Sequence, residues 1–558
     1  MLIDHFIKPI LFITSTAVVF LLYEKVSHNL LTNSRKNYKY CMILLNMVCI
    51  FLISVITPTP RAYNAMYAGF ISNSSSTQDS ISGFTAFYKI PNLLNYSNSF
   101  LFQFDLSPSL ITFLWKLIFS IVSYFAFYNL AFLLVTKAET RAAFAFIFTI
   151  STGYSGIFTD TYPVLHVWDS SSAYGFLGLI LIILGVAFFA RQKLISLSVV
   201  TLLCSVISPT NALVLIIFLI FISYREKMDN HSNRYLIGII AVSLSIALQL
   251  VTKIFSDKIF VDKNISKDLY ESYVNLWDYH RSEQNYTISN GNLLLLVLLM
   301  LLLIFFTFSR VHFLERWQLG ILLIALALAP SAHYLQYFLP GIHLSDELKR
   351  IMFLRLSIVG IPILIISIYG FIKIMSELYM NRIPKPLFLF SFFVSAILSA
   401  VMSNPIIGDG LRQFHAESST SNHEINGSSV LVFPGFSEEA IWSLSLLPVI
   451  NTENGLDFIP YIKGSEKLVD EILLGGYGVS LANPPYAPHC GCLPNFNSIE
   501  QTWEKRNFND WESISQKLVF ELVLAPNYVI LDLTKVAIYG DFTIYRIQEI
   551  LSDTNVSE

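Results

Sequence analysis

Long apolar runs separated by short polar segments dominate the first 404 residues. Runs of about 17 to 25 apolar residues are long enough, as helices, to cross a hydrocarbon core about 30 Å thick. They lie near residues 6–23, 41–57, 110–135, 142–158, 173–190, 235–254, 291–309, 317–334, 351–374 and 386–404. This pattern predicts a polytopic α-helical membrane protein with about 11–12 transmembrane helices.

The apolar stretch 194–223 is too long for one span and is interrupted in its middle. Ser208-Pro209-Thr210-Asn211 is a turn-forming and helix-capping sequence. We therefore expect two shorter helices that meet at Pro209. Under this interpretation, the basic residues before and after the stretch lie on the same side of the membrane.

Basic residues are concentrated in alternate connections, which orients the chain across the membrane. By the positive-inside rule, the connections rich in Lys and Arg face the cytoplasm. These basic residues are Lys25, Arg35, Lys36, Lys39, Lys137, Arg141, Arg191, Lys193, Arg225 to Arg234, Arg310, Arg316 and Lys373 to Lys385. The exterior segments are then 58–109, 159–172, 255–290, 335–350 and 405–558, with both termini outside. No small-residue cleavage site follows the first run, so it is expected to be a retained helix.

The overall composition supports this class and excludes others. The chain is 54% hydrophobic and only 13% charged, with a mean hydropathy of +0.58. A soluble globule of 558 residues would need roughly twice as many charges on its surface. Nucleic-acid binding is unsupported, because the net charge is -3 and no basic stripe lies on the exterior face. The expected location is a plasma membrane, the inner membrane if the source is bacterial.

After Pro405 the composition becomes that of a soluble domain, covering residues 405–558. Short apolar runs predict strands at 430–433, 528–531 and 544–547, and helical spacing predicts helices at 437–447 and 511–524. This alternation indicates an exterior (periplasmic) α/β domain.

Two local motifs in this domain resemble ligand-binding motifs but have simpler explanations. Gly475-Gly476-Tyr477-Gly478 lacks the following Lys-Ser or Lys-Thr pair of a phosphate-binding loop, so a flexible turn is expected. In His489-Cys490-Gly491-Cys492 a zinc site would need a second ligand pair, which is not visible. We therefore expect Cys490 and Cys492 to form a disulfide or to be two free thiols. The sequence indicates no cofactor, and no motif in it supports a divalent metal.

The first two exterior loops contain acidic and aromatic residues that could act on a substrate. Asp79 and Asp105 lie in the first loop, and Asp105 could alternatively cap the span that follows it. The second loop combines carboxylates, an imidazole and aromatic rings in ten residues, as sugar sites do. Its candidates are Asp160, His166, Trp168 and Asp169. An interfacial aromatic belt, which needs no ligand, is the alternative.

The third and fourth exterior loops contain residues suited to binding an anion. Asp278, His280 and Arg281 lie in the third loop, where a His-Arg pair could bind a phosphate; a solvated charged turn is the alternative. Arg350 and Arg355 are five residues apart at the outer end of a predicted span, near enough to one helical face to hold one anion. Snorkelling to the membrane surface is the alternative for Arg355.

This arrangement resembles the glycosyltransferase-C superfamily, and especially uncharacterised bacterial members linked to surface polysaccharides. The resemblance covers most of the chain and rests on its architecture and a few weak motifs. Those motifs are Asp105, Ser208-Pro209-Thr210-Asn211, Asp278-Tyr279-His280-Arg281, Arg350 to Arg355, Val430-Leu431-Val432-Phe433-Pro434, Trp503-Glu504-Lys505-Arg506 and Tyr528-Val529-Ile530-Leu531. Two departures are the missing paired acidic motif in the first exterior loop and an extra helix before it.

The resemblance implies an enzyme that moves a sugar from a polyprenyl-phosphate-type lipid donor to a glycan or lipid-linked acceptor on the exterior face. It would make Asp105, or failing it Asp79, the base, and it would give Arg350, Arg355 and His280 the leaving phosphate. A polysaccharide or lipid-oligosaccharide transporter or polymerase is one alternative. It predicts charges at mid-membrane depth, and these are nearly absent. A non-catalytic assembly protein is the other alternative.

Overall fold

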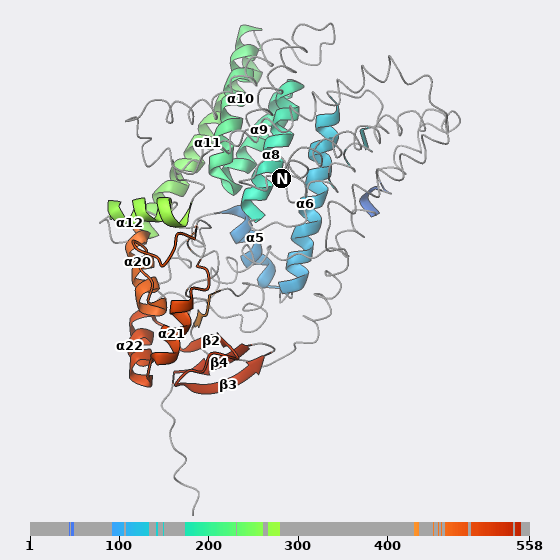
Figure 1. Cartoon of the computed structure of the whole chain (residues 1–558). Helices are drawn as coiled ribbons and strands as arrows, with labels where there is room; N and C mark the ends of the chain where they lie inside the picture. The colour runs from blue at the N-terminus through green and yellow to red at the C-terminus, as the bar shows by residue number, and fades with distance from the viewer. Residues whose placement is uncertain are drawn as a thin grey trace, which may run out of the picture. The chain divides into compact units, whose positions relative to one another are not determined.

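The computed structural model describes two compact units of the chain (Figure 1). The described residues are 92–104, 106, 108–132, 173–229, 231–259, 266–278, 429–434, 464–488, 493–539, 542–547 and the single positions 44, 46–48, 141, 142, 145, 149, 450, 456 and 459. The first unit contains the long helices up to Leu250, and the second contains the C-terminal sheet with segments drawn from two earlier parts of the chain.

The first unit is built from long apolar helices at the predicted places. They are α6 (Pro108–Ala131), α8 (Ala173–Ala190), α9 (Leu194–Ile207), α10 (Pro209–Met228) and α11 (Ser232–Ile259). Helix α8 coincides with the predicted run 173–190, and α6 and α11 cover most of 110–135 and all of 235–254. The predicted runs 6–23, 291–309, 317–334, 351–374 and 386–404 lie outside the described residues.

The predicted break at Pro209 is confirmed, and its cause is local. Ser208 leaves the helical conformation (φ -142°, ψ 80°) and Pro209 takes the first position of α10, where its missing N–H is not needed. The Asn211 side chain donates a hydrogen bond to the Ser208 hydroxyl (3.0 Å) and holds the turn. Two helices thus replace one long span.

Contacts between the helices fix their directions. Gly178 near the start of α8 lies beside Asn211 near the start of α10, and Phe189 at the end of α8 stacks on Phe218 at 4.6 Å. Helices α8 and α10 therefore run in the same direction, with α9 antiparallel between them in sequence. The Gln249 amide donates to the Pro209 carbonyl oxygen (3.3 Å), so α11 runs back toward the start of α10.

This alternation gathers basic residues at one end of the α8–α11 bundle. Arg191 and Lys193 lie between α8 and α9, and Arg225 and Lys227 are in the last turn of α10. Arg234 lies in the first turn of α11 and pairs with Glu226 at 3.6 Å. These residues therefore lie at one end of the bundle, and the Pro209 turn lies at the opposite end. That this end faces one side of a membrane stays a prediction.

Helix α11 also presents apolar side chains to the outside. Within the described segments, one stretch, Ser232–Thr252, is long and apolar enough to cross a membrane by length and composition, and most of it is exposed. Leu236, Ile240, Leu244 and Leu250 are each about half exposed. One such helix alone is weak evidence for a membrane protein, since a core helix of a soluble protein can have the same length and composition.

Close contact between α8 and the Pro209 turn gives a stability prediction. A methyl group at Gly178 would lie 2.5 Å from both Asn211 Nδ2 and Ser208 Cβ. Gly178→Ala is therefore expected to lower the free energy of unfolding by roughly 1–3 kcal/mol, as overpacking does. Gly185→Ala is the control, because there the nearest atoms belong to the flexible Leu215 side chain. Thermal unfolding of the purified full chain measures both, and an equal loss for the two variants would contradict the prediction.

The second unit contains a four-stranded mixed sheet with strand order β1-β2-β4-β3. The strands are β1 (Val430–Val432), β2 (Leu522–Pro526), β3 (Thr534–Tyr539) and β4 (Phe542–Arg546). Strands β1 and β2 are parallel, and the other pairs are antiparallel. The helices are α20 (Ser465–Ile472), the π-helix η8 (Leu473–Tyr477), α21 (Asn497–Lys505) and α22 (Phe508–Leu518). The strands predicted at 430–433 and 544–547 are confirmed as β1 and β4.

Two predictions in this domain were wrong. The helix expected at 511–524 ends at Leu518, because Val519 takes a left-handed conformation (φ 57°) and the chain then enters β2. The strand expected at 528–531 is a turn, in which the Val529 N–H donates to the Pro526 carbonyl oxygen (2.9 Å). The helix expected at 437–447 lies outside the described residues.

Candidate functional site

Of the eleven candidate site residues, the structure describes Asp278. The others lie outside the described residues: Asp79, Asp105, Asp160, His166, Trp168, Asp169, His280, Arg281, Arg350 and Arg355. The described parts of the candidate site are the segment that leads to Asp278 and the short helix that precedes Asp105 in the chain.

The segment before Asp278 is a short helix that changes its winding. Helix α12 (Lys267–Ser272) continues directly as the π-helix η4 (Tyr273–Trp277). The wider π turn lets the Asp278 N–H donate to the Tyr273 carbonyl oxygen (2.9 Å). The Tyr273 hydroxyl in turn donates to Asp278 Oδ2 (3.1 Å). Single π turns of this kind occur often at functional sites.

Asp278 is fully buried in this arrangement. The alternative of a solvated charged turn is therefore wrong for Asp278, because its carboxylate does not face solvent. A buried carboxylate needs hydrogen-bond partners, and the Tyr273 hydroxyl is one of them. The residues that follow it in the sequence, Tyr279 to Arg281, carry the other chemistry predicted for this loop.

The start of this segment is bonded to the C-terminal domain within the second unit. The Ser266 N–H donates to Glu466 Oε1 at 2.7 Å, although the two residues are 200 positions apart. Ser266 is the N-cap of α12, and Glu466 lies in the first turn of α20. Helix α12, drawn in green in Figure 1, lies beside α20, drawn in orange.

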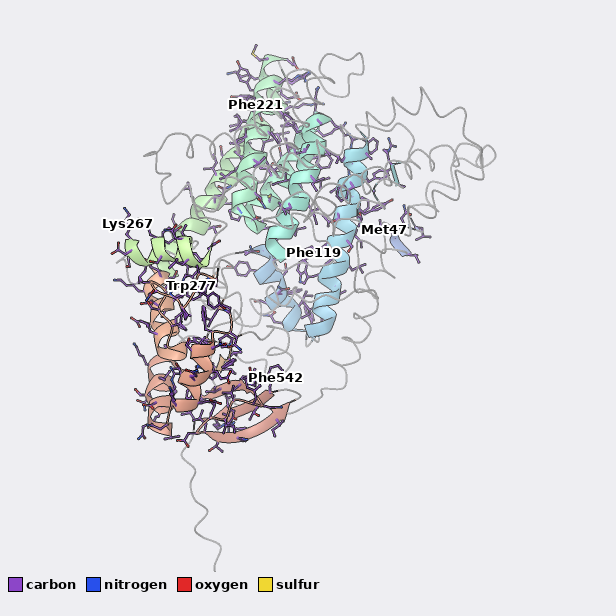
Figure 2. All side chains as sticks on the ribbon, viewed as in Figure 1. Met47, Phe119, Phe221, Lys267, Trp277 and Phe542 are labelled. Atoms are coloured by element: carbon purple, nitrogen blue, oxygen red, sulfur yellow. The ribbon has the colours of Figure 1, made fainter. Side chains whose placement is uncertain are left out.

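The end of the segment is bonded to the same domain. The Trp277 indole N–H donates to the Leu481 carbonyl oxygen at 2.8 Å, and the ring packs edge-on against Phe496. Trp277 is fully buried, and Figure 2 labels it at the end of the segment that begins at Lys267. The Leu481 N–H donates to Asp470 Oδ1 (2.7 Å). The segment whose carbonyl oxygen accepts from Trp277 is therefore itself fixed to α20.

Beneath this contact lies an aromatic core centred on Trp503. Its indole packs against Phe433, Tyr477 and Trp511, and its N–H donates to the Gly476 carbonyl oxygen at 2.9 Å. Trp503, the first residue of the motif noted in the sequence, therefore belongs to the core of the C-terminal domain, while Glu504 and Lys505 of that motif are exposed.

The glycine-rich segment 475–478 is not a flexible turn, which corrects that prediction. Gly475 and Gly476 belong to η8, and their carbonyl oxygens accept hydrogen bonds from the Arg506 guanidinium at 2.7 and 2.6 Å. A phosphate-binding loop presents N–H donors to its ligand, whereas here carbonyl oxygens receive a cation. The segment therefore has a structural role.

Arg506 itself is half-buried above the Trp511 ring, with 4.9 Å from its guanidinium carbon to the ring centroid. Burial lowers the pKa of Arg506 to about 10, although Asp510 and Tyr477 act in the opposite direction. At neutral pH the side chain is still protonated. It can therefore serve as a permanent cation between α21 and η8.

The same segment supplies a matched pair of glycine substitutions. Gly478 has a φ of +69°, which L-residues adopt at a cost of roughly 1–2 kcal/mol, and a Cβ there would lie 3.1 Å from Thr502 Cγ2. Gly475 has no such conformation, and its nearest contact would be 3.8 Å. We expect Gly478→Ala to destabilise the domain by about 1–2 kcal/mol and Gly475→Ala to have little effect. Limited proteolysis of the full chain distinguishes them, and similar cleavage rates would contradict the prediction.

Residues 93–102, in the predicted first exterior loop, form a helix that was not predicted from the sequence. Helix α5 (Leu93–Phe102) begins at the N-cap Asn92, whose side chain accepts from the Leu94 N–H (2.8 Å). Tyr96 and Phe100 are more than half exposed on one face of this helix, and Phe104 after its end is exposed too. Asp105 follows next in the sequence. Exposed aromatic residues at this spacing are typical of a helix at a membrane surface.

The structure offers no metal centre within the described segments. There, no group of three or more His, Cys, Asp or Glu residues lies where it could hold a metal ion. Cys490 and Cys492 lie outside those segments, while Cys204 is a buried free thiol in α9.

Two contacts in this region were not predicted from the sequence: that of Ser266 with Glu466 and that of Arg506 with η8. Glu466 was not among the predicted site residues, and Arg506 was named only as part of the motif Trp503-Glu504-Lys505-Arg506. The cap at Ser266 and the amphipathic helix at 465–472 are visible in the sequence, but nothing there links positions 200 residues apart. The hydrogen bond between Ser266 and Glu466 could be found only in the structure.

No model of a known protein family matches the chain, and a search of curated proteins finds no similar sequence.

Proposed function

We propose that the protein is an integral membrane glycosyltransferase, located in the inner membrane if the source is bacterial. It moves a sugar from a polyprenyl-phosphate-type lipid donor to a surface-glycan or lipid-linked acceptor. The observation that carries this proposal is the sidedness of the α8–α11 bundle. Basic residues lie at one end, and the Pro209 turn and Gln249 lie at the other.

This sidedness supports an exterior working face. If the basic end is cytoplasmic, α11 leads outward, and the segment after it, which contains α12 and Asp278, is exterior. The exposed apolar side chains of α11 and the aromatic face of α5 support a lipid environment. The alternation of basic connections in the sequence assigns the candidate residues of the other three loops to the same face.

In the proposed reaction, Asp105 is the base, with Asp79 as the other candidate. The carboxylate takes the proton of an acceptor hydroxyl, whose oxygen forms a bond to the anomeric carbon of the donor sugar. The bond from that carbon to the phosphate oxygen breaks, and the lipid phosphate leaves. His280, Arg281, Arg350 and Arg355 stabilise the leaving phosphate. Asp160, His166, Trp168 and Asp169 contact the sugar.

Mass spectrometry of surface glycans and lipid-linked intermediates in cells lacking the protein tests this function. We expect one sugar residue to be absent and its lipid-linked donor to accumulate, with both restored by the wild-type gene. Accumulation of a complete lipid-linked oligosaccharide on the cytoplasmic face would instead indicate a transporter. Unchanged glycans would contradict both functions and favour a partner-binding protein.

A further inference from the structure

The segment Ser266–Asp278 and the C-terminal domain form one folded body, with a hydrogen bond at each end of the segment. Glu466 holds Ser266 at the start, and Leu481 holds Trp277 at the end. Tyr270, Tyr273 and Val274 between them are buried. The third exterior loop is therefore not an independent loop up to Asp278.

The hydrogen bond at the start of the segment, from Ser266 to Glu466, is accepted by a buried carboxylate. Only 1% of Glu466 is exposed, a position that a carboxylate occupies when its charge is compensated. Glu466 lies in the first turn of α20 and accepts from the N-cap of α12, so it lies close to the N-termini of two helices. Both helix dipoles favour a negative charge there. The bond thus ties the start of the loop segment to α20.

The hydrogen bond at the end of the segment, from Trp277 to Leu481, is donated by a buried indole. Trp277 and Trp503 are both fully buried, and each donates its indole N–H to a backbone carbonyl oxygen, at 2.8 and 2.9 Å. Trp503 serves the domain core, whereas Trp277 belongs to the loop and reaches the segment after η8. Asp278, next to Trp277, is then fixed by Tyr273.

We propose that the C-terminal domain positions the third loop for the reaction, with Glu466 and Trp277 as positioning residues. They fix the point from which the chain continues to His280 and Arg281, the residues proposed to stabilise the leaving phosphate. This inference rests on the proposed function for its catalytic part. Its structural part, that the domain holds the loop at two points, does not depend on that function.

The test compares Trp277→Phe with Trp503→Phe in the purified full chain, by hydrogen exchange and by transfer kinetics with a polyprenyl-phosphate sugar donor. Trp277→Phe keeps an aromatic ring but removes the donor to Leu481. We expect about tenfold faster exchange in 266–278 and 478–488 and unchanged exchange in β2 and β4. Trp503→Phe should instead raise exchange in the sheet.

The kinetic readout separates positioning from stability. The cations of the third loop are proposed to stabilise the transition state, so displacing them should affect kcat more than donor binding. Trp277→Phe should therefore lower kcat at least tenfold and change the donor KM less than twofold. Trp503→Phe should leave kcat per folded molecule unchanged. Glu466→Ala should behave like Trp277→Phe, while Glu466→Gln, which keeps an acceptor oxygen for Ser266, should largely restore kcat.

Each outcome has a distinct meaning. Faster exchange across the whole domain in Trp277→Phe would overturn the two-point attachment, and local exchange with an unchanged kcat would overturn the positioning role. If the wild-type protein transfers no sugar but Trp277→Phe still shows the local exchange pattern, the proposed function fails and the attachment stands.

Discussion

Asp105→Asn is expected to reduce sugar transfer by about 10²–10⁴-fold, the usual contribution of a positioned general base. Asparagine has nearly the same shape as aspartate but cannot accept a proton at neutral pH. The acceptor hydroxyl would then attack with its proton still attached. In cells lacking the wild-type gene, the lipid-linked donor should accumulate as it does in the null strain, and mass spectrometry measures this.

Asp79→Asn is the matched control for this substitution, since it changes the other carboxylate of the same loop. It is expected to retain transfer within a few fold of wild type. Both variants must reach the membrane at wild-type levels, as measured by immunoblotting of the membrane fraction. Full activity of Asp105→Asn together with inactive Asp79→Asn would move the base to Asp79, and full activity of both would exclude a carboxylate base from this loop.

The helices of the first unit could be predicted because each is determined by features local to it. The apolar run 173–190 becomes α8 without change, and Pro209 ends α9 wherever the rest of the chain lies. The shared end of Arg191 and Arg234 followed from the same two facts. Local sequence was therefore sufficient for helix positions and their alternation.

The C-terminal domain was predicted less well, because its elements depend on distant partners. Leu522–Pro526 was assigned in part to a helix but becomes a central strand, since its neighbours β1 and β4 come from both sides in sequence. Tyr528 to Leu531 alternates in burial like a strand, yet it has turn conformation. Similarly, the contact of Glu466 with Ser266 is determined by the fold and leaves no local signal.

Arg506→Met is expected to destabilise the C-terminal domain by about 2 kcal/mol, which corresponds to roughly thirtyfold faster exchange of the η8 amides. The substitution removes two charge-assisted hydrogen bonds, to the carbonyl oxygens of Gly475 and Gly476, and the stacking on Trp511. The carbonyl oxygen of Gly476 keeps its bond from Trp503. Part of the loss is offset, because burying a guanidinium is itself unfavourable.

Lys505→Met is the control, because it removes the same charge from the adjacent, exposed position. It should change exchange less than twofold, since exposed charges contribute little. Burial lowers the pKa of Arg506 only to about 10, so the guanidinium is protonated in both the folded and the unfolded chain at pH 6 and pH 8. The destabilisation by Arg506→Met should therefore be the same at both pH values. A loss that appears at only one of them, or one matched by Lys505→Met, would show that Arg506 does not act as a permanent cation on η8.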